Sequence, residues 1–552
     1  MNKILIIGGV AGGATAAVRL RRLDEHAEII MFERGEYISF ANCGLPYYIG
    51  GTITDREDLL LQTPDSFHQR FNIDVRVLSE ILSIDQAAKT VSVENKQTGE
   101  IYTENYDKLI LSPGGAPIKP SIGGIDSECV FTLRNVADTD RIKSYIQMKN
   151  PRNAAVIGGG FIGVEMAENL KEAGLQVSII EMANQAIAPV DIDMACDIHQ
   201  YLHQKGVALY LNNGLQKITD NGDGLVLELQ SGTSLETDMV ILAIGVRPES
   251  DLAKKTSLKL NNRGGIVTDK YMRTSDPDIY AVGDAAEVVD FVTGQAAMIP
   301  LAGPANKQAR IAADHICGIM SEYSGTQGSA IIKIFDMTVA STGINEKTAQ
   351  KLNLSYDKIF LWIANHAGYY PGATPMSMKV IFENMSGKIL GAQIVGFDGV
   401  DKRCDVLATA IRAGMTASNL AELELCYAPP YSSAKDPVNM AGFVIENVLT
   451  GQVKNFHWHD VDKLPRDGSV ILLDVRNPGE VRNGKIDGFL NIPLDSLRER
   501  IGELDDSKPV YIHCHSGMRS YIAARILTQK GFETYNLSGG YRLYSSVKRF
   551  QP

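Results

Sequence analysis

The sequence predicts an α/β protein of several domains. A chain of 552 residues is longer than one hydrophobic core supports. A buried strand, a glycine turn and a helix occur together in MNKILIIGGVAGGATAAVRLRRL and again in AAVIGGGFIGVEMAENLKEAG. Each copy leads into another apolar strand, EIIMFE or QVSIIE, which completes a βαβ unit. Two such units in one chain indicate two bound nucleotides.

The composition and charge of the chain limit the classes of protein to which it can belong. Hydrophobic residues make up 44% and charged residues 22% of the chain, with a formal net charge of -11. These values are typical of a globular protein and argue against nucleic-acid and anionic-membrane partners. The apolar run at Ile4–Ile7 is too short for a signal segment, so we expect a cytoplasmic protein. The seven cysteines lack the paired spacing of a zinc site, so no metal is expected.

The first glycine turn predicts a Rossmann-like dinucleotide site, although Val10 replaces the middle glycine of the usual pattern. The strand before it, the helix after it and an acidic residue at the end of the next strand all favour this interpretation. A glycine-rich structural turn is the alternative. The predicted residues are Gly8, Val10, Ala11, Gly12, Gly13, Glu33 and Arg34.

The second turn carries all three glycines, so it predicts a second Rossmann-like domain. Glu181 ends the following strand, and Met182 and Ala183 come next, without a cation for a 2'-phosphate. NADH is therefore predicted over NADPH. The predicted residues are Gly158, Gly160, Phe161, Ile162, Gly163 and Glu181.

The two units, with IYAVGDAAE after the second, resemble the flavin-dependent pyridine nucleotide disulfide oxidoreductases over the first four-fifths of the chain. The resemblance implies that the first unit binds the ADP half of FAD, that Asp284 holds the ribityl chain, and that the second unit binds the nicotinamide cofactor. Phe161 would lie near the nicotinamide face. Other implied cofactor residues are Asn42, Ser112, Pro113, Gly114, Gly245, Gly283, Pro300, Leu301 and Ala302.

The segment SFANCGLPYY places Cys43 just after the first unit, with no second cysteine near enough for a local disulfide. A lone thiol beside a cofactor can form a sulfenic acid, or it can form a mixed disulfide with a small thiol. A merely buried cysteine is the alternative. We interpret Cys43 as the redox nucleophile.

SFANCGLPYYIGG, HAGYYPGATP and ELCYAPPYSSAKDP resemble the coenzyme A disulfide reductase branch of that family. The resemblance implies coenzyme A as a bound substrate or cofactor, and a homodimer in which Tyr369 and Tyr427 reach the partner's Cys43 site. Arg19 and Arg22 share a helix face that suits phosphates, with a solvated basic face as the alternative. The implied substrate residues are Thr15, Arg19, Arg22, Ser39, Asn42 and Lys435.

The last hundred residues, including LLDVRNPGEVRNGKIDGFLNIPLDSL and VYIHCHSGMRSYIAARIL, resemble a rhodanese domain. Cys514 begins a loop, closed by Arg519, whose N–H groups can stabilise a thiolate or persulfide. His515 stands where many rhodaneses carry arginine, which argues against thiosulfate. The implied domains are FAD-binding (1–112 and 247–322), NAD(H)-binding (113–246), α+β dimerisation (323–446), a linker (447–458) and an α/β rhodanese domain (459–552).

The expected function is NADH-dependent reduction of coenzyme A persulfide, other small persulfides, polysulfides or coenzyme A disulfide through Cys43 and FAD. The rhodanese domain would handle sulfane sulfur, an inference from domain pairing. One alternative is an NADH peroxidase or oxidase that uses a Cys43 sulfenic acid. Another is a sulfurtransferase based on Cys514, with the flavoprotein part as a redox sensor.

Overall fold

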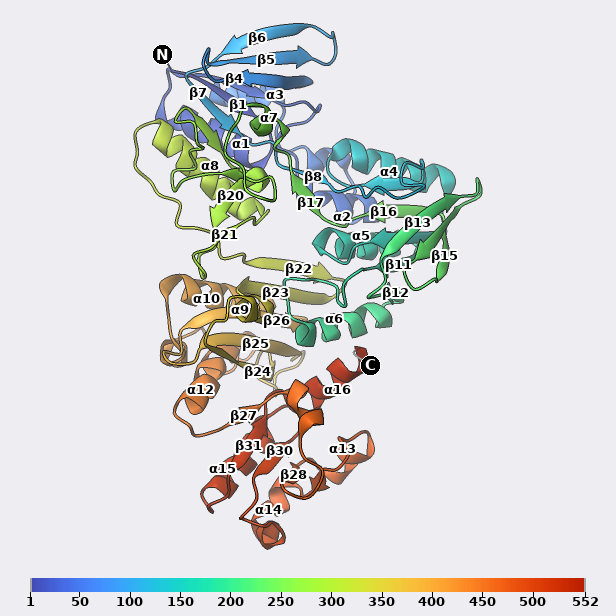
Figure 1. Ribbon diagram of the computed structural model, residues 1–552, viewed down its shortest axis with the longest axis vertical. Coiled ribbons are helices and arrows are strands. Elements are labelled where there is room, and N and C mark those ends of the chain that lie inside the picture. Colours follow the sequence, from blue (N-terminus) through green and yellow to red (C-terminus); the bar gives the residue numbers. More distant parts are fainter. Residues whose placement is uncertain (1, 551–552) are drawn as a thin grey trace. The chain divides into compact units, whose positions relative to one another are not determined.

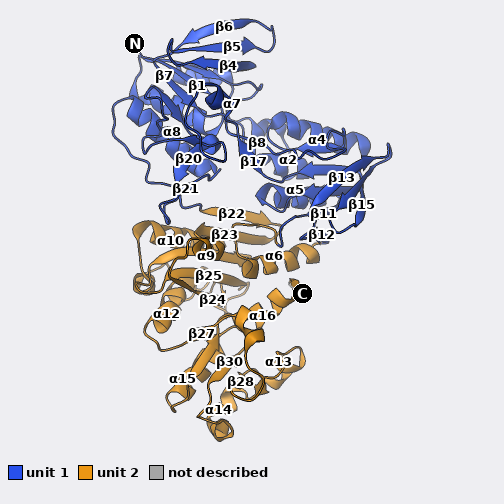
Figure 2. Cartoon of the chain, in the orientation of Figure 1, with its two compact units in different colours: residues 1–184, 206–328 blue, residues 185–205, 329–552 orange. Residues whose placement is uncertain are grey.

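The computed structural model describes residues 2–550, which form two compact units (Figure 2). One unit comprises residues 1–184 and 206–328, and the other comprises residues 185–205 and 329–552. Each unit has hydrophobic clusters of its own, so each buries apolar side chains by itself. No helix within residues 2–550 has both the length and the apolar character needed to cross a membrane.

The first parallel sheet has the strand order β19-β7-β1-β2-β3. Two of its strands, β1 and β7, are labelled in Figure 1. Its central strand, β1, is buried over four of its five residues, as expected when both faces of a parallel sheet are covered. Helix α1 (Ala11–Leu23) follows β1 directly and packs against α8 (Ala302–Ile316). The first glycine turn therefore lies at the carboxyl end of the sheet. The strands are Lys3–Ile7 (β1), Glu28–Phe32 (β2), Asp74–Arg76 (β3), Lys108–Leu111 (β7) and Ile279–Ala281 (β19).

The second parallel sheet, of order β12-β11-β10-β16-β9, repeats this design. Helix α5 (Phe161–Glu172) follows β10 and places the second glycine turn at the carboxyl end of that strand. The two predicted βαβ units are thus present. The strands are Val130–Thr132 (β9), Asn153–Ile157 (β10), Gln176–Ile180 (β11), Val207–Tyr210 (β12) and Met239–Leu242 (β16).

Smaller antiparallel sheets accompany the two parallel sheets of the first unit. Strand β8 (Gly115–Pro117) pairs with β17 (Val246–Pro248), so the chain leaves the first Rossmann-like domain and returns to it through neighbouring strands. The other strands are Ser79–Asp85 (β4), Thr90–Asn95 (β5), Ile101–Asn105 (β6), Leu215–Asp220 (β13), Leu225–Leu229 (β14) and Ser234–Thr237 (β15).

The second unit contains a five-stranded antiparallel sheet of order β22-β23-β26-β25-β24. Its inner strand β25 is buried over seven of nine residues, because side chains on both of its faces are covered. Helix α10 (Val400–Ala413) packs on β23 and β26, and α12 (Pro437–Leu449) packs on β24. The strands are Ala330–Ile334 (β22), Met337–Gly343 (β23), Tyr356–Ala364 (β24), Pro375–Glu383 (β25) and Ile389–Gly396 (β26).

Helix α6 (Ile192–Gln204) joins this antiparallel sheet through a buried ion network. The Nζ atom of Lys379 on β25 lies 3.0 Å from Asp191, 2.9 Å from Asp193 and 2.7 Å from Glu346. Burial disfavours the charged lysine, but the three carboxylates outweigh this effect and raise the pKa of Lys379. The network thereby holds residues 185–205 on the antiparallel sheet.

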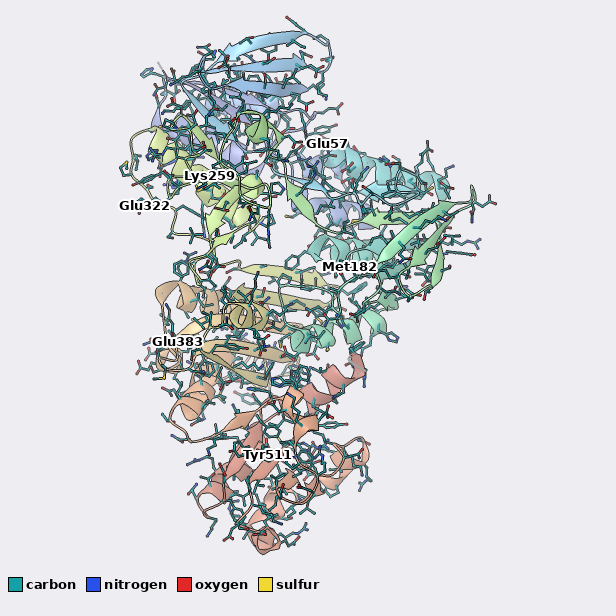
Figure 3. All side chains as sticks on the ribbon, in the orientation of Figure 1. Glu57, Met182, Lys259, Glu322, Glu383 and Tyr511 are labelled. Carbon is teal, nitrogen blue, oxygen red and sulfur yellow. The ribbon has the colours of Figure 1, made fainter. Side chains whose placement is uncertain are left out.

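A parallel sheet of order β27-β31-β30-β28-β29 forms the last part of the second unit. Strand β27 (Asn455–Phe456) lies in the predicted linker but pairs with β31, because the Phe456 side chain packs into this domain's core. Tyr511 (labelled in Figure 3) lies on β30, and its ring stacks on that of Tyr535 of the adjacent strand β31, at 4.7 Å between centroids. The other elements are Ile471–Asp474 (β28), Leu490–Asn491 (β29), Val510–His513 (β30), Thr534–Leu537 (β31), Met518–Thr528 (α15) and Gly540–Phe550 (α16).

Candidate active site

The first glycine turn has two positions that only glycine can occupy. Gly8 has a φ of 100°, and a Cβ atom there or at Gly13 would collide with backbone oxygen. The N-terminus of α1 has no side-chain cap, so its N–H groups are available to an anion. Glu33 accepts hydrogen bonds from the N–H groups of Gly9 at 2.9 Å and Gly35 at 2.8 Å. These bonds fix its carboxylate at the rim of the turn, where the sequence predicts a ribose.

The second glycine turn has the same construction. Gly158 has a φ of 106°, Gly160 faces open space where a Cβ would stand, and α5 also begins without a side-chain cap. Glu181 accepts hydrogen bonds at 2.7 Å from the N–H groups of Gly159 and Ala183. Met182 beside it is 71% exposed and offers no charge to a 2'-phosphate (Figure 3). The turn therefore suits NADH better than NADPH.

Five of the predicted flavin residues lie in loops that follow neighbouring strands of the first sheet, whereas Pro300 and Leu301 directly precede α8. Ser112, Pro113 and Gly114 follow β7, and Gly283 and Asp284 follow β19. The Gly283 N–H donates to Gln308 of α8 at 2.8 Å, which ties this loop to the helix that starts at Ala302. Burial raises the pKa of Asp284. The parallel sheet thus brings these residues to one edge, the usual place for a nucleotide.

Three other predicted residues lie elsewhere in the first unit. Arg34 is ion-paired with Glu249, which also pairs with Arg134, so its guanidinium is already neutralised. Gly245 has a φ of 121° and precedes β17. Ile162, next to Phe161 at the start of α5, is 39% exposed. An exposed apolar side chain at a helix start is available to a flat ligand.

Cys43 lies in a short 3-10 helix, Asn42–Gly44, that runs into α2 (Leu45–Gly50). Ser39, with a φ of 45°, donates its N–H to Gly9 at 2.8 Å, so the segment before Cys43 is fixed to the first glycine turn. The Cys43 side chain is exposed. Partial desolvation by the surrounding protein raises the pKa of its thiol, and the charges of Glu165 and Asp284 add to this effect.

Glu165 is a site residue that the sequence analysis missed. It lies one turn after Phe161 on α5, which packs against α2. Burial, with the charge of Glu168, raises the pKa of Glu165 to about 7, and the Tyr47 hydroxyl lies within hydrogen-bonding reach. A carboxyl that titrates near neutral pH can hold a proton close to Cys43. Its position four residues after Phe161 was the available sequence signal.

The residues predicted to bind phosphate groups differ in whether another residue already pairs with their side chains. Arg19 is paired with buried Asp314 at 2.6 Å, and Thr15 donates its hydroxyl to Asn306 at 2.8 Å. Arg22, one turn further along α1, is exposed. The helix face therefore presents one exposed cation, while Arg19 is held in place by its carboxylate.

Tyr369, Tyr427 and Lys435 belong to the second unit and are exposed. The two phenol oxygens lie 3.2 Å apart, although the residues are far apart in the sequence. Lys435 immediately precedes Asp436, which caps α12. The fold therefore brings the predicted tyrosines together as a hydrogen-bonded pair.

Cys514 lies at the base of a tight loop between β30 and α15 and is 1% exposed. Its Sγ atom accepts hydrogen bonds from the Gly517 N–H at 3.1 Å and the Ser520 hydroxyl at 3.3 Å. Ser520 is a partner that the sequence analysis did not select. Such donors stabilise a thiolate or a persulfide.

Arg519 makes a two-bond ion pair with Glu480, at 2.7 and 2.6 Å. These bonds lower the pKa of Glu480 to about 2. The charge expected from Arg519 is thus shared with a carboxylate. Burial lowers the pKa of His515, so this residue does not supply the cation that its position carries in many rhodaneses. Asp474 and Arg476 form a buried ion pair that orders the loop after β28.

Three models of known families match most of the chain. The model for pyridine nucleotide-disulphide oxidoreductases matches residues 2–309, and the model of their dimerisation domain matches residues 329–437. The chain belongs to the pyridine nucleotide-disulphide oxidoreductases. This flavoprotein oxidoreductase uses FAD and NAD(H). Residues 457–546 match the rhodanese-like domain. The predicted fold class and the predicted resemblance to these families are therefore confirmed.

Individual relatives of this oxidoreductase were also found. A coenzyme A disulfide reductase of Staphylococcus haemolyticus is 38% identical over 444 residues, 80% of this chain and 99% of the relative. The reduced CoADR-RHD of Bacillus anthracis is 54% identical, with a TM-score of 0.97 over 99% of this chain and 98% of that chain. An NAD-dependent persulfide reductase from A. fulgidus is 37% identical, with a TM-score of 0.92 over 98% of this chain and 100% of that chain.

A third similar structure is that of an enzyme with a different activity. The water-forming NADH oxidase of Lactobacillus brevis is 30% identical, with a TM-score of 0.78 over 82% of this chain and 100% of that chain. This match leaves part of the chain uncovered, whereas the two preceding structures extend over nearly all of it.

Proposed function

We propose that this oxidoreductase uses NADH to reduce coenzyme A persulfide, and also other small persulfides, polysulfides or coenzyme A disulfide, through Cys43. The observation that carries the proposal is the exposed Cys43 thiol on a segment anchored to the first glycine turn. Support comes from the relatives, which include a coenzyme A disulfide reductase and an NAD-dependent persulfide reductase. A cytoplasmic location is part of the proposal, because a reducing compartment keeps the free cysteines of residues 2–550 as thiols.

The two glycine turns would hold the two cofactors. Residues of the first turn, with Glu33, Asp284 and the loop after Ser112, would hold FAD, while Gly158, Gly160, Gly163 and Glu181 would hold NADH. Bound FAD supplies the electrons that NADH delivers, and these return oxidised Cys43 to the thiolate. Phe161 and Ile162 would provide an apolar wall at the second turn, and Glu165 would hold a proton beside the thiol.

The reaction at Cys43 is an exchange between sulfur atoms. The Cys43 thiolate attacks the sulfur that is bonded to coenzyme A, and the electron pair of the broken S–S bond leaves on hydrosulfide. A Cys43–coenzyme A mixed disulfide results, and two electrons and a proton then release the thiol. With coenzyme A disulfide the leaving group is coenzyme A thiolate instead of hydrosulfide.

The tyrosine pair fits the proposed homodimer. In this proposal Tyr369 and Tyr427 of one subunit reach the Cys43 site of the other, where a phenol donates a hydrogen bond or a proton to the departing thiolate. Arg22, Lys435, Ser39 and Asn42 would contact the coenzyme A substrate. The exposure of both phenols and the match to a dimerisation domain support this arrangement.

The rhodanese-like domain would carry sulfane sulfur on Cys514. The donors from Gly517 and Ser520 support a persulfide on this atom.

Two alternative functions require different cysteines. An NADH peroxidase or oxidase needs Cys43 but not Cys514, and a Cys514 sulfurtransferase with a sensing flavoprotein needs Cys514 but not Cys43.

One experiment separates these functions. NADH oxidation and hydrosulfide release are measured in parallel with coenzyme A persulfide, coenzyme A disulfide and hydrogen peroxide, using native protein, Cys43→Ser and Cys514→Ser. The proposal expects turnover with the sulfur substrates that is lost in Cys43→Ser and kept in Cys514→Ser. Turnover with peroxide alone contradicts it in favour of a peroxidase, and hydrosulfide release that survives Cys43→Ser but is lost in Cys514→Ser favours the sulfurtransferase.

A further inference from the structure

A pocket of about 190 Å³ lies in the second unit, where α6, the antiparallel sheet and α16 come together (Figure 1). We call it the junction pocket. Its lining includes the aromatic rings of Trp362 and Phe397, which are 37% and 39% exposed although both rings are large and apolar. Amide side chains from α6, Gln200 and Gln204, line the same pocket. Exposed rings beside free amide groups are typical of a site for a flat polar ligand.

The junction pocket adjoins the loop that carries Cys514. The Trp362 ring packs edge-on against the ring of His515, at 5.4 Å between centroids. Arg542, which also lines the pocket, donates its backbone N–H to the carbonyl oxygen of His515 at 2.9 Å. Two residues of the pocket wall therefore contact the residue that follows Cys514. A ligand in this pocket would be placed next to the sulfur-carrying loop.

The two charged residues that line the junction pocket, Asp197 and Arg542, pair with each other, so their charges cancel. Asp197 accepts a hydrogen bond from Arg542 at 2.8 Å and further ones from the hydroxyls of Ser377 and Ser546 at 2.7 and 3.1 Å. The guanidinium also lies over Trp362, at 5.4 Å from the ring centroid. With its cation already paired, the pocket does not suit a small inorganic anion. It suits an uncharged aromatic ring whose edge carries hydrogen-bonding groups.

We propose that the junction pocket binds the purine-type ring of the small thiol that receives sulfane sulfur from Cys514. The ring lies against Trp362 and Phe397, and Gln200 and Gln204 contact its polar edge. This inference rests on the proposed function, because it assigns an acceptor to the sulfur that Cys514 carries. It adds a second binding site for the same class of thiol, separate from the Cys43 site.

The transfer step conserves atoms and electrons. The thiolate of the acceptor attacks the outer sulfur of the Cys514 persulfide, and the electron pair of the S–S bond that breaks returns to the Cys514 Sγ. The products are the acceptor persulfide and the Cys514 thiolate, so no external oxidant or reductant is needed. The N–H of Gly517 and the hydroxyl of Ser520 stabilise the departing thiolate.

The test uses the full chain with Cys43→Ser, so that sulfur chemistry at Cys43 is absent. Cys514 is loaded with polysulfide, and loss of its sulfur adduct is followed by mass spectrometry against increasing coenzyme A or pantetheine, which lacks the nucleotide. We expect coenzyme A to saturate at lower concentration than pantetheine. Phe397→Ala should raise the half-saturating coenzyme A concentration about tenfold, the effect of losing one stacking contact, without changing that of pantetheine.

Two controls make the result decisive. Met385→Ala removes an apolar side chain that is 90% exposed and outside the pocket, and it should change neither acceptor. If Phe397→Ala does not fold, the double variant Gln200→Ala and Gln204→Ala replaces it with the same expectation. Equal half-saturation by the two acceptors, or an equal change for both, would overturn the proposal. Failure of NADH-dependent reduction in protein with intact Cys43 would count against the proposed function alone.

Discussion

The hydroxyl groups of Tyr369 and Tyr427 lie 3.2 Å apart on exposed side chains, although 57 residues separate the two in the sequence. The hydrogen bond with Tyr427 raises the pKa of Tyr369, so this phenol keeps its proton at neutral pH. A protonated phenol on an exposed pair is suited to donate to a thiolate that another subunit presents. In the proposed homodimer, the pair would donate to the departing thiolate at the partner's Cys43 site.

Replacing both tyrosines with phenylalanine removes the two donors and keeps the rings. We expect kcat with coenzyme A disulfide to fall about a hundredfold, because the departing thiolate loses its proton donor, while the KM for NADH stays unchanged. Steady-state kinetics measures both constants. Tyr431→Phe, at another exposed tyrosine of the same region, is the matched control and should retain full activity. A double variant with native kcat would rule out the catalytic role.

The NADH preference should depend on Glu181. Glu181→Ala together with Met182→Arg replaces a carboxylate with a cation beside the second turn, so kcat/KM for NADPH should rise about tenfold or more relative to NADH. Rates with the two cofactors at limiting concentration give this ratio. Glu33→Ala, the corresponding change in the first turn, should lower the FAD content without altering the ratio. An unchanged ratio in the double variant would mean that the cofactor ribose lies elsewhere.

Glu165 should control how Cys43 responds to pH. Its pKa is raised to about 7, so it is ionised above neutral pH, and its charge then raises the pKa of the Cys43 thiol. Glu165→Gln should therefore make Cys43 react several-fold faster with iodoacetamide at pH 8, with little change at pH 6. Peptide mass spectrometry gives the rate, and exposed Cys426 in the same samples is the internal control. Equal acceleration at both cysteines would contradict this assignment.

The same carboxyl affects stability. Because the pKa of Glu165 is higher in the folded protein than the ordinary value of 4.5, its contribution to stability is fully present below pH 4.5 and is lost as pH rises through about 7. Glu165→Gln should therefore lose less stability than the native protein between pH 6 and pH 8. Thermal unfolding at the two pH values compares them, and parallel curves would contradict the prediction.

The buried ion network should be a major stabilising feature of the second unit. Lys379→Ala leaves Asp191, Asp193 and Glu346 buried without their cation, so we expect a loss of about 3 to 5 kcal/mol in the free energy of unfolding of this unit. Denaturant unfolding measures it. Lys217→Ala, which breaks an exposed pair with Glu228, should cost about 1 kcal/mol or less. A small effect of Lys379→Ala would show that the carboxylates take up protons at little cost.

The sequence predicted the parts of the fold that have a strong local pattern. Both glycine turns, the acidic residues Glu33 and Glu181, and the loop that begins at Cys514 lie where the motifs indicated. In each case a buried strand and a helix start fix the position of the residues between them. The resemblance to known families supplied the tyrosines, which carry no local signal of their own.

Other features depend on contacts between distant segments, which a single sequence does not reveal. Residues 455–456 were assigned to a linker because Gly451 and a mix of polar and aromatic residues break the pattern there, and the pairing of β27 with β31 depends on Phe456 packing into the domain core. The pairing of Arg19 with Asp314 and of Arg519 with Glu480 likewise needs helices and loops to be placed in space. Glu165 was missed because its raised pKa comes from burial and from Glu168.

The central claim is that Cys43 forms a covalent bond with the substrate thiol. The most direct measurement is a single turnover of the FAD-loaded, NADH-reduced protein with coenzyme A persulfide, quenched in acid and followed by peptide mass spectrometry. We expect a transient coenzyme A adduct on Cys43, in step with the release of hydrosulfide. Hydrosulfide release without that adduct, or with the adduct on Cys514 instead, would contradict it.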